Sequence, residues 1–63
     1  MYTKIKAVDF DVIETTDSEK YKVEQEIMLW SAGDSLEIQS VSGGKFSIKN
    51  TFRLKSVLAH KWF

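Results

Sequence analysis

The chain contains no cysteine and no proline, and its only histidine is His60. Without cysteine it can form neither a disulfide nor a thiolate metal site, and a single histidine cannot build a histidine cluster. No catalytic motif is present either: there is no nucleophile elbow, no glycine-rich phosphate loop and no pair of carboxylates at a telling spacing. We therefore predict that the protein is not an enzyme and that it uses no cofactor or metal.

Long apolar runs are also missing. No run approaches the ~18–20 residues that a membrane-spanning helix needs. The first residues do not contain the uninterrupted apolar segment of a secretory signal. Together with the absence of cysteine, this predicts a cytoplasmic, intracellular protein without a membrane partner.

The chain is short, with 63 residues, and we predict one small β domain over residues 1–63. A domain of this size buries only about 60% of its unfolded surface and is marginally stable. Small domains usually gain support from disulfides, a metal or oligomerisation. Because the composition removes the first two, we expect a homodimer or a higher homo-oligomer.

Residues 34–58 carry the clearest structural pattern, because apolar and polar residues alternate on both sides of Ser42–Gly44. A three-residue loop over Ser42–Gly44 pairs Ile38 with Ile48. A two-residue loop would set Ile38 opposite Lys49 and would place the apolar side chains on different faces. The pattern therefore predicts a β-hairpin with a three-residue loop.

The same register makes further predictions about this hairpin. It sets Glu37 directly opposite Lys49, and it gives Gly44 the left-handed position of the loop. A turn is favoured at Asn50-Thr51, because asparagine tolerates turn geometry, although one long bent strand over residues 45–58 is the alternative. The later apolar residues expected on the inner face are Phe52, Leu54 and Leu58.

Residues 3–13 are predicted to form the first strand, and residues 14–18 a turn. Ile5 belongs to the opposite phase of alternation from the rest of this strand, so we predict a bulge near Ala7. The residues expected to share one face after the bulge are Val8, Phe10 and Val12.

Residues 19–30 fit both a strand and a helix. Their alternation has the strand period, but Val23, Ile27 and Trp30 also fit helical spacing. We favour the strand, because a loop over residues 31–34 would match it to the next strand. The matched pairs would be Leu29 with Leu36, Ile27 with Ile38, and Gln25 with Ser40. Residues 56–63 could continue the last strand or form one helical turn.

These elements predict an all-β fold, a bent antiparallel meander of about five strands. Two architectures fit: an SH3-like small barrel, or an open curved sheet that is completed by dimerisation. The stretch GDSLEIQSVSGGKFSIKN is weakly similar to the rhythm of apolar residues and glycines in bacterial SH3-like modules. The similarity covers about a quarter of the chain and implies the small barrel.

Charge is unevenly distributed along the chain, with a net charge of −5 over residues 1–44 and +5 over residues 45–63. The basic segment is interleaved with aromatic residues, which suits a nucleic-acid surface, because cations bind phosphates and rings stack on bases. The candidate residues are Lys45, Lys49, Arg53 and Lys55. The competing interpretation is that these cations pair with acidic neighbours, and a neutral domain gains little counterion-driven affinity.

Aromatic and acidic residues provide the candidates for a protein interface. Trp30, Trp62 and Phe63 could be interface anchors or could cover the ends of a barrel. Asp9 and Asp11 could complement a basic protein surface. By elimination, the first hypothesis is a non-enzymatic protein-binding module, a small inhibitor or regulator of the phage or bacterial accessory type. The alternative is a nucleic-acid-binding small β-barrel that uses residues 45–63.

Overall fold

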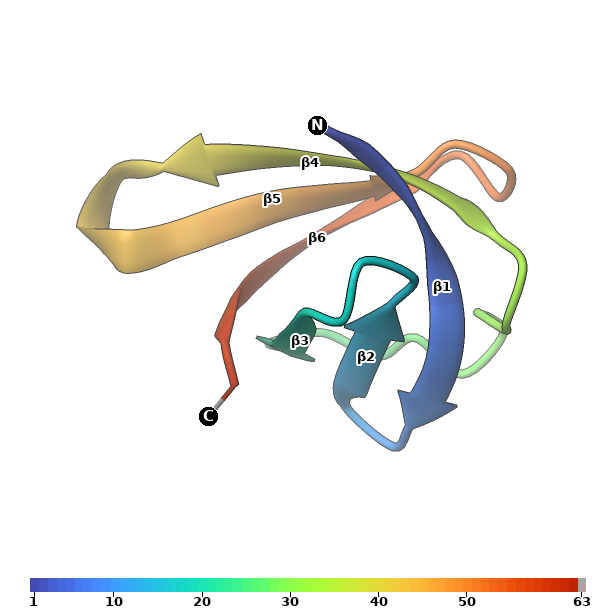
Figure 1. Ribbon diagram of the computed structural model, residues 1–63. Helices are drawn as coiled ribbons and strands as arrows, with labels where there is room; N and C mark the ends of the chain where they lie inside the picture. The colour runs from blue at the N-terminus through green and yellow to red at the C-terminus, as the bar shows by residue number, and fades with distance from the viewer. Residues whose placement is uncertain (63) are drawn as a thin grey trace.

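The computed structural model describes residues 1–62, and six antiparallel strands account for most of them (Figure 1). The strands are β1 (Tyr2–Asp9), β2 (Val12–Thr15), β3 (Lys20–Val23), β4 (Ser35–Val41), β5 (Lys45–Asn50) and β6 (Lys55–Lys61). A single 3-10 turn, Ser42–Gly44, joins β4 to β5. In residues 1–62 no helix has the length and apolar character to cross a membrane.

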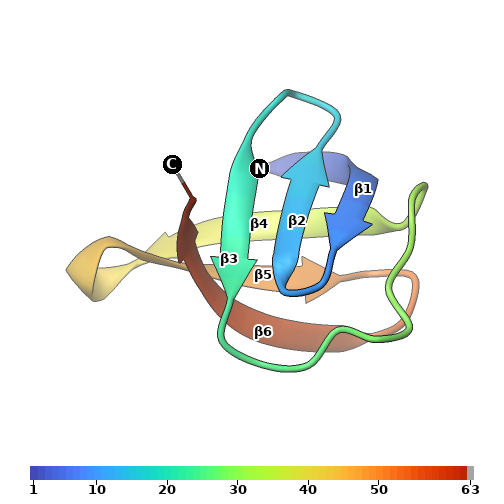
Figure 2. The same ribbon diagram turned by 90° about the horizontal axis from the view of Figure 1, so that it is seen from below.

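The sheet closes on itself in the order β1-β2-β3-β6-β5-β4. Pairing of β1 with β4 completes the ring, and Met1 and Ile38 exchange backbone hydrogen bonds of 2.7 and 3.0 Å at this seam. Figure 2 shows β1–β3 lying across β4–β6. The all-β prediction is confirmed, with six strands in a closed barrel. Closure removes the free sheet edges that an open sheet would have to cover with a second copy.

The core is apolar and spans all six strands. Ile13, Leu36, Ile48 and Ala59 are completely buried. Tyr21 packs edge-to-face against Phe46, with 5.4 Å between the ring centroids.

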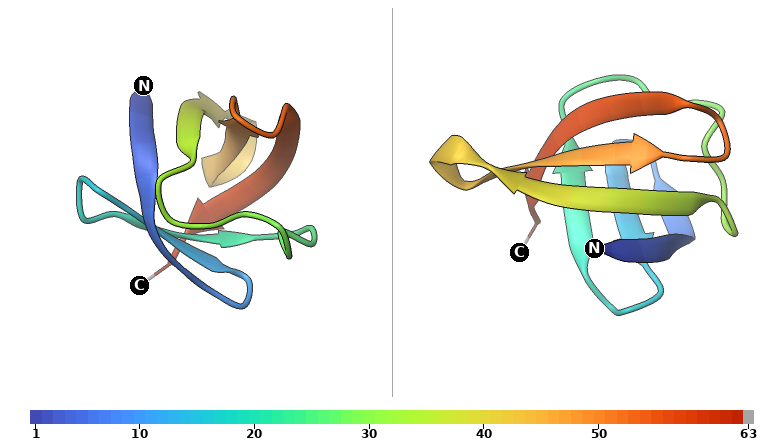
Figure 3. Two further views of the ribbon diagram at one scale, coloured as in Figure 1. Left: turned by 90° about the vertical axis from the view of Figure 1, so that its right-hand side faces the viewer. Right: turned by 90° about the horizontal axis from the view of Figure 1, so that it is seen from above.

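The β4–β5 hairpin has the predicted register. Ile38 is paired with Ile48, and Glu37 with Lys49, across the three-residue loop. Both Gly43 (φ 77°) and Gly44 (φ 73°) take the left-handed region that glycine tolerates best. This hairpin projects beyond the rest of the barrel (Figure 3, right).

The predicted break after β5 is confirmed, but the phase beyond it is wrong. A four-residue turn pairs Asn50 with Lys55, which changes the inward residues from even to odd numbers. Val57 and Ala59 therefore face the core. Residues 56–61 continue as strand β6, and the positions expected on the inner face (Phe52, Leu54 and Leu58) are exposed instead.

The first predicted strand is two strands. The register shift between Ile5 and Ala7 confirms the bulge. The chain then reverses after Asp9, however, so Phe10 lies in a turn and is 91% exposed. After this reversal Ile13 occupies the core. Glu14 and Thr15 belong to β2, so the next turn begins later than predicted.

The interpretation of residues 19–30 as one strand or one helix is wrong. Only Lys20–Val23 forms a strand, which pairs with β2 and β6. The partners of β4 are β1 and β5, so the pairing of Leu29 with Leu36 does not occur. Residues 24–34 instead cross one end of the barrel as a loop.

Candidate functional site

Large apolar side chains are exposed on one loop and two turns at one end of the barrel. They come from the β1–β2 turn, the loop over residues 24–34 and the β5–β6 turn. The left view of Figure 3 shows the loop crossing this end between the two turns. The exposed fractions are 91% for Phe10, 85% for Met28, 80% for Leu54, 76% for Leu29 and 72% for Phe52. We call these five residues the end surface.

Two adjacent open hollows indent this end of the barrel. One, of about 450 Å³, is lined by Met28, Leu29 and Trp30 together with the charged residues Glu26, Arg53 and Lys55 and by Ile27. The other, of about 310 Å³, extends toward the β1–β2 turn and includes Phe10 and Asp11. Because both are lined by Glu26, Ile27 and Met28, the two hollows adjoin along the loop.

Trp30 lies beneath this surface as part of the core. It is 5% exposed, and its neighbour in the loop, Ile27, is 4% exposed. The Trp30 amide donates a 3.0 Å hydrogen bond to the Ile27 carbonyl, which makes a tight turn between the two. These two side chains close the end of the barrel, while Met28 and Leu29 between them point outward. Trp30 therefore supports the end surface from below.

A buried polar cluster fixes the β5–β6 turn against the end of the loop. One carboxylate oxygen of Asp34, Oδ2, accepts hydrogen bonds from Arg53 Nε (2.7 Å), Asn50 Nδ2 (2.9 Å) and the Ser31 amide (3.2 Å). Asn50 is completely buried, and its Oδ1 accepts the backbone amides of Phe52 (3.0 Å) and Arg53 (2.9 Å). The exposed residues of the turn are thus held in place by the residues beneath them.

Asp34 remains ionised in this cluster. Burial by itself would raise the pKa of its carboxyl group, but the hydrogen bonds from Arg53, Asn50 and the Ser31 amide and the positive charge of Arg53 outweigh it. The pKa of Asp34 is therefore held below its ordinary value. A paired carboxylate at this depth, with three hydrogen bonds to one of its oxygens, is a structural element of the turn.

Two residues of the end surface occupy backbone conformations that bulky side chains rarely adopt. Phe10 has φ 57° and Leu54 has φ 58°. The Leu54 amide donates a 2.8 Å hydrogen bond to the Asn50 carbonyl, an arrangement in which glycine is usual. The left-handed conformation costs about 1–2 kcal/mol for a residue with a side chain. Neither side chain recovers this cost by burial, which is typical of residues retained for function.

Leu54→Gly is expected to raise the free energy of unfolding by about 1 kcal/mol, because glycine adopts φ 58° without strain. Urea unfolding of the wild type and the variant measures the difference. Phe52→Gly is the matched control: this neighbour is 72% exposed and has no positive φ, so glycine there should lower stability. A loss of stability in both variants would contradict the assignment of strain to Leu54.

The opposite charges of the two halves of the chain are largely joined by ion pairs in the fold. Asp11, a predicted interface residue, lines the smaller hollow and lies 3.7 Å from Lys22. The cations of residues 45–63 that pair with acids of residues 1–44 are Lys45 with Glu24 (2.9 Å), Arg53 with Asp34 (2.7 Å) and Lys61 with Glu19.

The four predicted nucleic-acid residues are not brought together as one free cationic surface. Lys45 and Arg53 are engaged by acids. Lys49 lies on the outer face of β5 opposite Glu37, and Lys55 lies at the edge of the larger hollow. Phe46 is half-buried against Tyr21, so its ring is not available to stack on a base.

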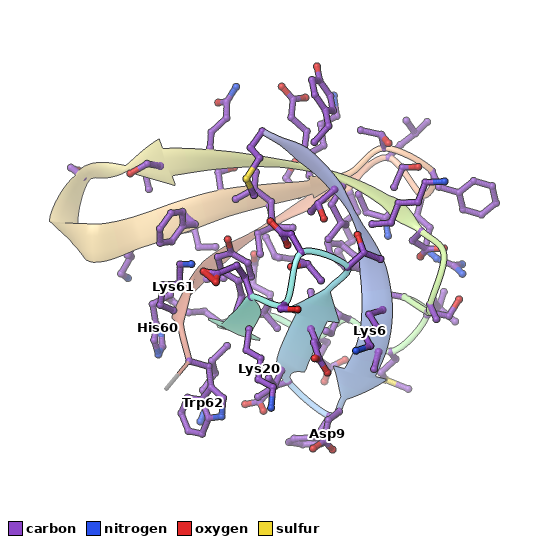
Figure 4. All side chains as sticks on the ribbon, in the orientation of Figure 1. Lys6, Asp9, Lys20, His60, Lys61 and Trp62 are labelled. Atoms are coloured by element: carbon purple, nitrogen blue, oxygen red, sulfur yellow. The ribbon has the colours of Figure 1, made fainter. Side chains whose placement is uncertain are left out.

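Trp62 does not line either of the two hollows beside the loop and lies against Lys20 and Lys22 of β3. It is 44% exposed, and the Lys22 ammonium lies 4.8 Å from the centroid of its ring. It lines a hollow of about 160 Å³ with Lys20 and Asp9, and Figure 4 shows it beside Lys20.

The third predicted aromatic anchor, Phe63, lies outside the described residues. Within residues 1–62, no three histidine or acidic side chains gather as metal ligands.

Most of the end surface was missed by sequence reasoning. Alternation assigned Phe10, Leu29, Phe52 and Leu54 to the core, and nothing distinguished Met28. The signal that could have revealed Phe10 is weak, because Phe10-Asp11 lacks the glycine or asparagine that usually marks a two-residue turn.

Comparison of the chain with protein-family models, with curated proteins and with solved structures found no match.

Proposed function

We propose that the protein is a non-enzymatic protein-binding module that binds through the end surface. The observation that carries this proposal is that five large apolar side chains, each more than 70% exposed, come from one loop and the two turns beside it, although the core of the barrel is already filled by other residues. Contiguous apolar surface rimmed by charged residues is typical of protein-interaction sites. Aromatic and methionine side chains are also enriched at such interfaces.

The backbone strain at two residues of the end surface also supports the proposal. Phe10 and Leu54 hold unfavourable backbone conformations while their side chains remain in solvent. Selection for stability alone would favour glycine or asparagine at both positions. Contact of these side chains with a partner would explain why large apolar residues are retained at strained and exposed positions.

We further propose that the module acts as a small inhibitor or regulator, of the kind found among phage and bacterial accessory proteins, by occupying the surface of another polypeptide in the cytoplasm. The alternative of nucleic-acid binding has less support. Counterion release requires cations that are free to meet phosphates, and three of the five cations of residues 45–63 already contact carboxylates.

The proposal is tested by immobilising the chain and capturing its partner from an extract of the source cells, supplemented with a differently tagged copy of the chain itself. We expect a polypeptide that is retained after nuclease treatment and is not released by a moderate increase in salt, because an apolar interface depends little on screening. Recovery of nucleic acid that leaves at moderate salt would overturn the proposal in favour of the basic segment.

A further inference from the structure

We propose that the protein binds an extended segment of its partner, which pairs as an added strand with the free edge of β6 at Ser56 and lays apolar side chains into the larger hollow. This inference rests on the proposed function, because the larger hollow is lined by Met28 and Leu29 of the end surface. It adds the conformation of the partner and the way in which it is recognised.

The strand β6 is only partly paired on the side that faces β3. The ladder between these strands joins residues 21–23 to residues 59–61, and one further backbone hydrogen bond runs from the Glu24 amide to the Leu58 carbonyl (2.9 Å). However, β6 begins at Lys55, and β5 pairs with it from there to His60 on the other side. In the described part of the chain, the first residues of β6 therefore have a strand on one side only.

The backbone groups of Ser56 point toward this open side. The Trp62 amide donates a 3.0 Å hydrogen bond to the Lys20 carbonyl, and the Leu58 carbonyl accepts one from Glu24. Because the backbone groups of successive residues in a strand alternate between its two neighbours, the even-numbered residues of β6 face the β3 side. The Ser56 amide and carbonyl accordingly face the open edge, and within residues 1–62 the structure gives neither group a partner there.

A side chain takes the place of a strand at one position of this edge. The Leu58 amide donates a 3.4 Å hydrogen bond to Oε1 of Gln25, whose side chain is exposed. Unpaired backbone groups at a sheet edge are a template for another strand. Such edges bind extended polypeptides through main-chain hydrogen bonds, and pockets beside the edge select the side chains. An extended polypeptide is thus the ligand whose chemistry matches the edge at Ser56.

The larger hollow adjoins this edge. It is lined by Lys55, the residue next to Ser56, and by loop residues that include Met28 and Leu29. Alternation places Lys55 on the same face of β6 as the buried Val57, while Ser56 lines a separate hollow with residues of β4 and β5 on the outer face. An added strand would alternate in the same way, so every second side chain of the partner would lie on the side of the larger hollow. We therefore expect apolar residues at alternate positions of the bound segment.

A second free edge, on β4, provides a matched control. Met1 and Ile38 exchange backbone hydrogen bonds, so the even-numbered residues of β4 face β1. The Ser40 amide lies beyond the pairing with β1 and has no backbone partner on that side within residues 1–62. Ser40 does not line the larger hollow. Serine therefore occupies equivalent backbone positions at two edges, of which only the one at Ser56 adjoins this hollow.

The test begins with the selection of random short peptides, displayed on phage, against the immobilised wild-type chain. We expect the enriched peptides to carry apolar residues at alternate positions. Ser56→Pro should bind an enriched synthetic peptide at least about tenfold more weakly, because proline has no amide hydrogen to donate. Proline is tolerated at edge positions whose amide faces away from the ladder, so the fold should persist, which circular dichroism verifies. The controls Ser40→Pro and Ser56→Ala should bind the peptide as the wild type does.

Amide hydrogen exchange, followed by NMR on the wild type, gives a second measurement that needs no variant. A saturating amount of the enriched peptide should slow exchange at the Ser56 amide at least about tenfold and leave exchange at the Ser40 amide unchanged. Selection that enriches no peptide, or unchanged exchange at Ser56, would overturn the inference. So would binding by Ser56→Pro equal to that of the wild type, or an equal loss of binding in Ser40→Pro.

The inference and the proposed function fail in different ways. Ser56→Pro is compared with Met28→Ser/Leu29→Ser in the capture of the partner from the cell extract. If Ser56→Pro retains the captured polypeptide and the loop variant loses it, strand addition is overturned and the proposed function stands. If neither variant diminishes capture, both are overturned.

Discussion

Replacement of Asp34 by alanine is expected to lower the free energy of unfolding by about 3 kcal/mol, because it leaves the buried Asn50 amide group without its acceptor and removes the ion pair with Arg53. Asp34 is 6% exposed and Asn50 is completely buried. Loss of the carboxylate would orphan Asn50 Nδ2, Arg53 Nε and the Ser31 amide at once. A domain of this length has about 3–9 kcal/mol of total stability, so Asp34→Ala should lose a large fraction of it.

Urea unfolding at neutral pH measures this effect, with Asp9→Ala as the matched control. Asp9 is an exposed aspartate at the end of β1, and its replacement should change stability by no more than about 0.5 kcal/mol. Similar small effects in the two variants would show that the Asp34 cluster does not hold the turn.

The pH dependence of the same cluster follows from the lowered pKa of Asp34. A carboxyl group whose pKa is lower in the folded state stabilises the fold fully above its ordinary value of 3.8. This contribution is lost as the pH falls from that value through the folded-state pKa. The stability difference between the wild type and Asp34→Asn should therefore shrink in this acidic range, and a difference that grows on acidification would contradict the sign of the shift.

The two tryptophans are expected to respond very differently to alanine. Trp30→Ala should cost about 3–5 kcal/mol, because it removes a large side chain that is 5% exposed and leaves a cavity at the end of the barrel. Trp62→Ala should cost about 1 kcal/mol, because that ring is 44% exposed and its contact with Lys22 is a surface cation–π interaction.

Thermal and urea unfolding of both variants provide the comparison, and the wild type supplies the reference. Because each variant removes the same kind of side chain, the difference between them reports chiefly the different burial of the two rings. Comparable, small losses would mean that Trp30 does not close the barrel. The end surface would then lack the rigid support that we assign to it.

The β4–β5 hairpin could be predicted because its determinants are local. Alternation on both sides of Ser42–Gly44 admits one loop length, and that loop determines the register of Ile38 with Ile48. The bulge between Ile5 and Ala7 was predictable for the same reason, since an interruption of the phase is visible in neighbouring residues. The prediction of which residues face the core failed where the alternation of apolar and polar residues continues through a turn whose length the sequence does not show. The four-residue turn after Asn50 inverted the inward face of β6.

The candidate site was harder to predict, because exposed and buried apolar residues have the same appearance in a sequence. Ile27 and Trp30 are buried from a loop that has neither strand nor helical period, while Met28 and Leu29 between them face solvent. The position of the loop across the end of the barrel determines which of these side chains are buried and which are exposed, and this position cannot be read from the sequence. The ion pairs of the basic segment were likewise hidden, because they join residues such as Glu24 and Lys45 that are distant in the chain.

The most direct test of the central claim is to repeat the capture experiment with Met28→Ser/Leu29→Ser in place of the wild type. These side chains are 85% and 76% exposed, so their replacement leaves the core intact. The control is Tyr2→Ser, which removes a side chain of equal exposure (78%) from β1, outside the end surface. We predict that the loop variant loses the captured polypeptide while the control retains it. Undiminished capture by the loop variant, or equal loss in both, would contradict a protein-binding role for the end surface.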